Sequence, residues 1–478
     1  MAALSVSRKY QAHAQAIAVI LMLASATLAV SGSGALSPEG KERPTSYSWK
    51  ETASMALPRS SPAVVTLPDG DILVTGGLSI SGPTSTTEIF DVQQMKWRPG
   101  PTMISKRVGH TATLLDDGTV LITGGETGTG TTSSAELLNL SIGASISLPS
   151  MYFGRSAHAA VKLAGGMVLV TGGSDWVTGE WKQAELFDPV NHSWKPAGNM
   201  AYPRIFFALQ ILESGMVVAI SGDENGTSEL YDPSSNSWIG TAKMNEKRYG
   251  AGSMELADGG ILAAGGMVDS TTLYTTEIYD PSSNSWNPAA PMIHPRAHFS
   301  MNRLSNGSVL AAGSWDSTGV SGTSEVFLPD TGEWAEVGNM NHPRGAHGSA
   351  SLPGGAVLVM GGVTDSTETS TAEVYAGESV SPPSGLRMPK DIIPLVIVIA
   401  NDLPGYSANG LIAKLLAAQA QYDDGANATC LEILDAFYNQ VRAFHQSGHL
   451  SEPGTTLLYA GYSQVVECIG GVPQPSIP

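Results

Sequence analysis

This sequence has few cysteines, and it has fewer positive than negative charges. Its 478 residues include only two cysteines, Cys430 and Cys468, so the long stretch that precedes them offers no thiol to any site. Lysine and arginine number 25 against 43 aspartates and glutamates, which gives a formal net charge of −18. Nucleic-acid affinity depends on clustered Lys and Arg. We therefore predict no nucleic-acid partner.

The first part of the chain contains a single long apolar run. Arg8 and Lys9 precede an apolar stretch over residues 14–30, which small residues follow up to Ala35. A basic start, a short apolar run and a small-residue exit are typical of a secretory signal peptide, here residues 1–35. An uncleaved anchor is the alternative, but the run is short for a bilayer span. We expect a secreted or cell-surface protein with no stable membrane span after cleavage, and a mobile mature N-terminus over residues 36–45.

What the sequence has in abundance is glycine, 54 residues of it, arranged in a repeat. Each unit carries a glutamate, and an arginine stands 19 residues after each of the first six glutamates. The glutamates are Glu88, Glu136, Glu185, Glu229, Glu277, Glu325 and Glu373. The arginines are Arg59, Arg107, Arg155, Arg204, Arg248, Arg296 and Arg344. Chance does not maintain such spacing over seven copies, so the repeat determines the fold.

Two further positions of the unit recur. A tryptophan stands nine residues after the glutamate in five units, whereas the second unit has Ser145 there. A Gly-Gly pair, or an imperfect copy of it, follows each arginine by 17 residues, after a short apolar run such as Val168–Val170. A large flat side chain in the tryptophan position suits packing between neighbouring repeats. We expect Ser145 to leave the second unit under-packed there, unless Ile146 compensates.

These residues resemble the kelch repeat, whose pattern is Gly-Gly, then E-x-(Y/F)-D-P, a tryptophan, and M-x-x-x-R. The resemblance implies an all-β propeller with one four-stranded antiparallel blade per repeat, here seven blades over residues 46–376. The chain supplies a spare strand around Tyr47–Lys50 and lacks an outer strand after Tyr375. Joining the two ends would complete the seventh blade and remove an exposed edge.

The composition changes after the repeats. Residues 377–390 read as a Pro/Ser/Gly linker, and residues 391–472 contain segments with helical periodicity. This tail resembles the small helical domain called FIMAH, on pieces such as Leu411–Leu416 and Leu434–Val441. If its last helices form an antiparallel hairpin, Cys430 and Cys468 lie side by side. An exported protein meets oxidising conditions, so we expect a disulfide between them.

The residues that carry chemistry in related folds are missing or differently placed. Galactose oxidase, a secreted kelch propeller, needs a tyrosine cross-linked to a cysteine, and both cysteines here lie outside the propeller. His110, His158 and His347 each stand three residues after a repeat arginine. They could ring a metal, but such residues are more often satisfied within the repeat. We predict no metal and no cofactor.

The repeat arginines could form an anion-binding ring, but a glutamate at fixed spacing favours structural Arg–Glu pairs instead. Connections between the second and third strands differ from blade to blade and carry aromatics suited to ligand contact. These aromatics are Trp176, Trp181, Tyr274 and Trp315. The favoured hypothesis is a non-catalytic module that binds an extracellular protein or glycan. The alternative is an extracellular carbohydrate-active enzyme, which a convergent pair of carboxylates would favour.

Overall fold

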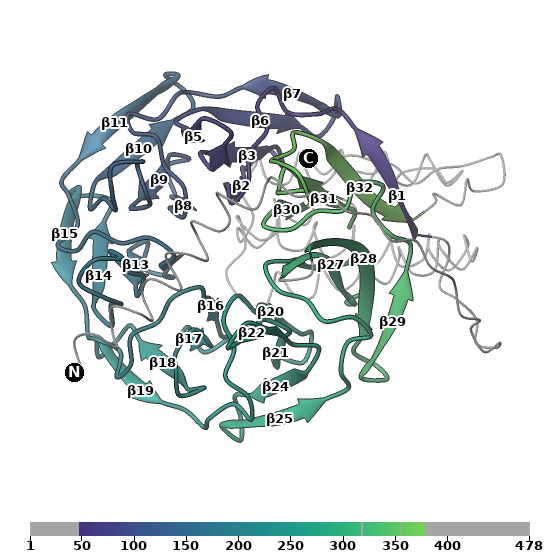
Figure 1. Cartoon of the computed structure of the whole chain (residues 1–478). Coiled ribbons are helices and arrows are strands. Elements are labelled where there is room, and N and C mark those ends of the chain that lie inside the picture. Colours follow the sequence, from purple (N-terminus) through teal and green to yellow (C-terminus); the bar gives the residue numbers. More distant parts are fainter. Residues whose placement is uncertain (1–46, 317–318, 354, 378–478) are drawn as a thin grey trace, which may run out of the picture. The chain divides into compact units, whose positions relative to one another are not determined.

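The computed structural model describes residues 47–316, 319–353 and 355–377, and these form seven four-stranded antiparallel sheets arranged around a common axis (Figure 1). We number the sheets as blades 1 to 7 in chain order. The predicted helical tail, linker, signal peptide and disulfide lie outside the described residues. Among the residues described, no helix is long and apolar enough to span a bilayer.

Each blade runs from an inner strand to an outer strand. Blade 1 holds β2 (Ala63–Thr66), β3 (Ile72–Thr75), β6 (Thr87–Asp91) and β7 (Lys96–Pro99). Blade 2 holds β8 (Thr111–Leu114), β9 (Val120–Thr123), β10 (Ala135–Asn139) and β11 (Ala144–Leu148). Blade 3 holds β12 (Ala159–Lys162), β13 (Val168–Thr171), β14 (Ala184–Asp188) and β15 (Ser193–Pro196). Blade 4 holds β16 (Ala208–Ile211), β17 (Val217–Ile220), β18 (Ser228–Asp232) and β19 (Ser237–Gly240).

The remaining blades follow the same order. Blade 5 holds β20 (Gly252–Glu255), β21 (Ile261–Ala264), β24 (Thr276–Asp280) and β25 (Ser285–Ala289). Blade 6 holds β26 (Ser300–Arg303), β27 (Val309–Asp316), β28 (Gly319–Leu328) and β29 (Glu333–Val337). Blade 7 holds β30 (Gly348–Ser351), β31 (Val357–Met360), β32 (Ala372–Gly377) and, from the start of the chain, β1 (Tyr47–Thr52). Two short hairpins, β4 (Leu78–Ser79) with β5 (Gly82–Pro83) and β22 (Met267–Val268) with β23 (Thr271–Thr272), lie in connections.

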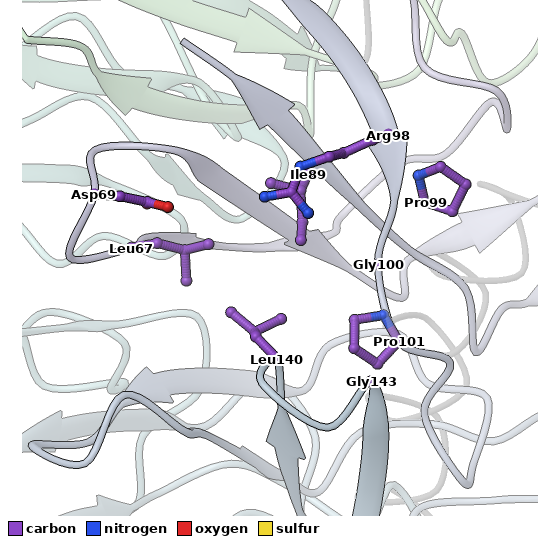
Figure 2. A pocket seen from close by; sticks show the side chains of 9 residues that line it. All are labelled: Leu67, Asp69, Ile89, Arg98, Pro99, Gly100, Pro101, Leu140 and Gly143. Atoms are coloured by element: carbon purple, nitrogen blue, oxygen red, sulfur yellow. The ribbon is translucent and has the colours of Figure 1, made fainter. Parts of the chain in front are cut away.

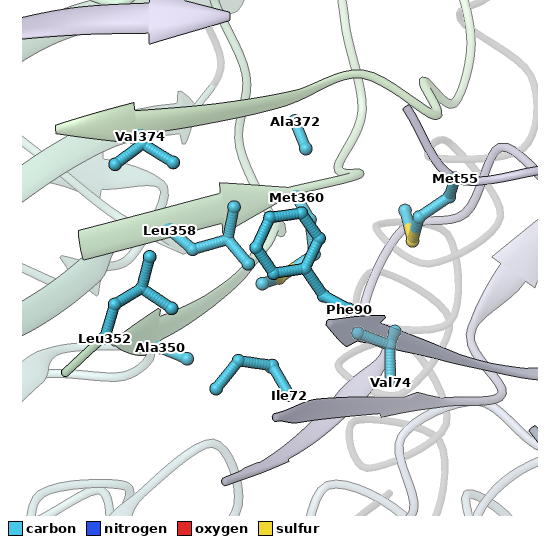
Figure 3. Close-up of a cluster of buried hydrophobic side chains, with 10 residues drawn as sticks. All are labelled: Met55, Ile72, Val74, Phe90, Ala350, Leu352, Leu358, Met360, Ala372 and Val374. Atoms are coloured by element: carbon cyan, nitrogen blue, oxygen red, sulfur yellow. The ribbon is translucent and has the colours of Figure 1, made fainter. Parts of the chain in front are cut away.

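The hydrophobic core lies between blades rather than inside any one of them. The second strands, such as β3 and β31, are buried at every position because blades cover both of their faces. Phe90 and Ile72 of blade 1 pack against Leu358 and Met360 of blade 7 (Figure 3). A blade therefore buries its apolar surface only when both neighbours are in place.

The repeat tryptophan forms the outer end of these interfaces, as predicted. In blade 1, Trp97 packs on Phe90 with ring centroids 5.1 Å apart and donates its indole N–H to the Ala53 carbonyl at 2.7 Å, at the end of blade 7. Trp194 and Trp238 donate in the same way to the carbonyl of Pro149 and of Gly198 in the preceding blade. In these three blades the indole thus ties the outer strand to the blade before it.

The sixth blade differs from the others in its central connection. Elsewhere both residues of the glycine pair adopt positive φ angles, as Gly76 (55°) and Gly77 (99°) do. In blade 6 only Gly313 does so (φ 72°), because the second position, which is glycine with φ of 78–100° in the other blades, is Ser314, whose side chain disfavours this conformation. The chain instead shifts register between Ala312 and Ser314 and continues as an extended hairpin. The expected loop is therefore largely strand.

Candidate functional site

The connections between the second and third strands lie on the same face as those that lead from one blade into the next. In the connection that leads from β1 into blade 1, the Met55 N–H donates to the Ser370 carbonyl at 2.9 Å and the Arg59 N–H donates to the Thr369 carbonyl at 3.2 Å. Both carbonyls belong to the connection between the second and third strands of blade 7. We call this the long-loop face. The opposite face consists of tight turns such as Asp258–Gly259.

The seven repeat arginines are buried beneath the long-loop face. Arg248 donates from Nη1 to the Gly265 carbonyl at 2.8 Å and from Nη2 to Glu277 Oε1 at 2.8 Å. Glu277 in turn accepts backbone N–H groups of Asn245 and Glu246. The other ion pairs have the same plan: Arg59–Glu88, Arg107–Glu136, Arg155–Glu185, Arg204–Glu229, Arg296–Glu325 and Arg344–Glu373. Both charges are used within the blade, so this ring does not present cations to an anionic ligand.

Two residues after each arginine, the chain forms a collar around the propeller axis. The collar residues are Ser61, Gly109, Ala157, Phe206, Gly250, His298 and Ala346, all with φ between 47° and 66°. Six backbone hydrogen bonds of 2.7–3.4 Å link them, each from a collar N–H to the collar carbonyl of the preceding blade. Five collar side chains are small or absent, as the left-handed conformation favours. The exceptions, Phe206 and His298, therefore call for an explanation.

Phe206 and His298 form the centre of an aromatic cluster. Their rings meet edge to face at 5.8 Å, across the collar position occupied by Gly250. Trp176 of blade 3 packs on Phe206 at 6.1 Å, and Trp315 of blade 6 packs on His298 at 5.8 Å. We call Trp176, Phe206, His298 and Trp315 the mouth cluster. All four side chains are half-buried, so each retains an accessible part.

Carboxylates lie at the Trp176 end of the cluster. Glu126 of blade 2 lies beside Trp176 and accepts a hydrogen bond from the Thr131 hydroxyl at 2.5 Å. Burial raises the pKa of Glu126, and the nearby charge of Asp175 adds to the rise, although hydrogen bonds oppose it. Asp175 is committed to its own loop, because its Oδ1 accepts N–H groups from Val177, Thr178 and Gly179.

Of the four predicted ligand-binding aromatics, the structure brings Trp176 and Trp315 into the mouth cluster and leaves two outside it. Trp181 packs on Phe153 at 5.1 Å and donates its indole N–H to the Gly154 carbonyl, so it fastens two connections of the same blade. Tyr274 is 52% exposed and joins no ring contact within the described part of the chain. Phe206 and His298 were not among the predicted residues. The sequence does contain a signal for them: the other collar positions have small residues, whereas these two have large side chains.

The comparisons with known proteins agree with the fold. A family model described as the Kelch motif matches residues 59–104 and 252–293. These matches fall on repeats that the structure builds as blades of a seven-bladed ring. The chain is a kelch-repeat β-propeller. No curated protein matches its sequence.

A solved structure with the same fold is described as a novel fungal alcohol oxidase with catalytic diversity among the AA5 family, in complex with copper. It is 16% identical to the kelch chain, with a TM-score of 0.60, and the match covers 72% of this chain and 80% of that one. This likeness concerns the fold alone. In the described part of the kelch chain, no three His, Cys, Asp or Glu side chains gather as metal ligands, and residues 47–377 include no cysteine. The residues present therefore do not fit a copper site of the cross-linked tyrosine–cysteine type.

The three histidines of the kelch repeats do not converge. His110 Nε2 lies 2.8 Å from the Thr75 hydroxyl, His158 Nε2 lies 3.0 Å from that of Thr111, and His347 Nε2 lies 3.0 Å from that of Ser300. In each case the hydroxyl belongs to the preceding blade, so the expectation of partners within the repeat itself was wrong. The ring packs against the first glycine of that blade, and those of His110 and His158 are buried, which explains the contact between blades.

These histidines predict an acid-sensitive propeller. Burial, together with the charges of nearby arginines, lowers the pKa of His110 and of His347 to about 3. Unfolding exposes both rings, which then bind protons near pH 6.5, so stability falls as the pH drops from about 6.5 towards 3. At pH 5 each should destabilise the fold by about 2 kcal/mol relative to pH 7.

Urea unfolding at pH 7 and pH 5 tests this prediction. Phe207 and Phe299 occupy the equivalent position against Gly172 and Gly265, so phenylalanine suits this environment. The variant His110→Phe/His347→Phe should lose about 4 kcal/mol less than the wild type between the two pH values. An equal loss in both proteins would show that other groups control the acid response.

Proposed function

We propose that this kelch propeller is a non-catalytic binding module, exported from the cell, that holds a protein or glycan ligand at the mouth cluster. The observation that carries the proposal is the contiguity of Trp176, Phe206, His298 and Trp315, which come from three blades. The basic start, apolar run and small residues of the first 35 positions support export.

The physical character of the cluster suits ligand binding. Half-buried aromatic rings offer a large contact area that loses little conformational entropy on binding, and their flat faces stack on sugar rings or on apolar side chains. Binding hot spots lie near the centre of an interface and are rich in tryptophan. Two tryptophans at the centre of a face built of variable connections meet both conditions.

Glu126 and Asp175 are the observation that favours a second candidate, an extracellular carbohydrate-active enzyme. Glycoside hydrolysis uses two carboxyl groups whose pKa values differ, and burial raises that of Glu126. However, the Asp175 carboxylate is occupied by N–H groups of its own loop and by the Thr178 hydroxyl. A base or nucleophile needs a free oxygen directed at the substrate. The binding function is therefore the better supported one.

Binding assays with aromatic variants test the proposal. Purified propeller is applied to a glycan array and, in parallel, used to capture extracellular proteins. Replacing Trp176 or Trp315 by alanine should weaken binding of the ligand so found by about 30-fold each, the loss expected for a hot spot of about 2 kcal/mol. Tyr274→Ala, on the same face and outside the cluster, should change affinity less than three-fold or so.

Two results would contradict the proposal. One is unchanged affinity in the Trp176→Ala/Trp315→Ala variant together with loss of binding after a substitution on the tight-turn face, for example at Asp258. The other is turnover of a bound glycan that Glu126→Gln abolishes, which would establish the enzyme instead.

A further inference from the structure

The outer edge of the propeller has one slot that no side chain of the described residues fills. Six blades fill this position with a tryptophan that packs on the aromatic residue opposite it in the neighbouring strand. The pairs are Trp97 on Phe90, Trp194 on Phe187, Trp238 on Tyr231, Trp286 on Tyr279, Trp334 on Phe327 and Trp49 on Tyr375. In blade 2 the same cross-strand pair is Ser145 with Leu138. Blade 2 therefore has neither the tryptophan nor the aromatic residue on which it packs.

A cavity of about 390 Å³ lies at this place, between blade 1 and blade 2 (Figure 2). Leu67, Ile89 and Leu140 line it. In the repeat they correspond to Leu352, Val374 and Val92, which belong to the cluster on which Trp97 packs. The cavity therefore lies at the tryptophan slot of blade 2, next to Ser145, whose hydroxyl donates to the Thr102 carbonyl at 3.1 Å. Ile146 does not fill it, since its side chain is 41% exposed, so the predicted packing defect is confirmed.

The cavity also has a carbonyl that can accept an indole N–H and a guanidinium that can lie beside the ring. Ala53, Pro149 and Gly198 accept the indole N–H of the next blade's tryptophan, and the equivalent carbonyl in blade 1 belongs to Pro101, which lines the cavity. Its oxygen accepts one hydrogen bond from Thr87 and has a second lone pair. Arg98 lies at the opening, where Asp71 holds its guanidinium at 3.1 Å. A guanidinium beside an aromatic ring adds a cation–π attraction.

We infer that this slot binds an aromatic side chain, an indole best of all, presented by a partner protein. The chain itself cannot supply the indole. Its nine tryptophans all lie within the described residues, and each is buried or half-buried in its own contacts. A volume of about 390 Å³ falls within the range of small-ligand sites and accommodates one indole with part of its backbone. This site is separate from the mouth cluster and does not depend on the proposed function.

N-acetyl-L-tryptophanamide is the probe, and its binding to the full chain can be followed by calorimetry or ligand-observed NMR. Wild type should bind it. Ser145→Trp places an indole in the slot from within, so it should raise the melting temperature and weaken probe binding at least ten-fold. Ser145→Ala, which leaves the cavity open, should bind as wild type does. Trp176→Ala should also bind normally, which separates this site from the mouth cluster.

Arg98→Ala is a second variant that leaves the core intact, and it should weaken probe binding several-fold through loss of the cation–π contact. The inference is overturned if wild type does not bind the probe. It is also overturned if Ser145→Trp and Arg98→Ala both bind the probe as tightly as wild type does. Stronger binding of phenol or of an aliphatic amide than of the indole probe would contradict the choice of ligand.

Discussion

Replacing Arg248 by alanine should lower the free energy of unfolding by about 3–5 kcal/mol, the usual cost of breaking a buried ion pair. The guanidinium is fully buried and makes hydrogen bonds to Gly265, Thr275 and Glu277. Its loss leaves the Glu277 carboxylate buried without its cation and the Gly265 carbonyl without its donor, whereas the Thr275 carbonyl keeps the Gly265 N–H. Arg248→Lys should recover little, because an ammonium lacks the planar fork that reaches all three acceptors.

Arg98→Ala is the matched control, since it removes an arginine of the same protein whose ion pair with Asp71 is half exposed. Such pairs contribute about 0–1 kcal/mol, so its denaturation midpoint should stay close to that of the wild type. Equal midpoints for Arg248→Ala and Arg98→Ala would show that the buried network does not stabilise the blade. The measurement is urea denaturation followed by tryptophan fluorescence at pH 7.

The buried network also explains why so much of the fold could be predicted from the sequence. Each blade is built by contacts at fixed spacing, such as an arginine with the carbonyl of the residue 17 positions later. A spacing of this kind repeats in the sequence whenever the contact repeats in space. The blades, the packing of the tryptophan position and the gap at Ser145 were therefore all accessible before the structure was known.

The mouth cluster was not accessible in the same way. Phe206 and His298 come from different blades and meet only because the collar residue between them is Gly250, without a side chain. Repeat spacing places each residue within its own blade but does not say which non-repeating side chains meet across the axis. The same reason explains the histidines, whose partners lie in the preceding blade rather than in their own.

Deleting residues 46–50 should destabilise the propeller more than any single substitution, because it removes most of the strand that closes the ring. β1 pairs with β32 from Tyr47 opposite Gly377 to Thr52 opposite Ala372. Trp49 in this strand is buried, packs on Tyr375 at 5.1 Å and donates its indole N–H to the Ser324 hydroxyl of blade 6 at 3.0 Å. Replacing Trp49 alone by alanine should cost about 3–5 kcal/mol, and the deletion adds the loss of backbone pairing.

The deletion should also lower solubility, because β32 then becomes an unpaired edge that can pair with another chain. A deletion of residues 41–45 shortens the chain by the same five residues and leaves β1 intact, so it should melt as the wild type does. The melting temperature and the monomer fraction in size-exclusion chromatography measure the two effects. Only a protein without residues 46–50 should show both a lower melting temperature and concentration-dependent association. If it melts at the wild-type temperature and stays monomeric, the ring does not depend on closure by its first strand, and blade 7 must be stable with three strands.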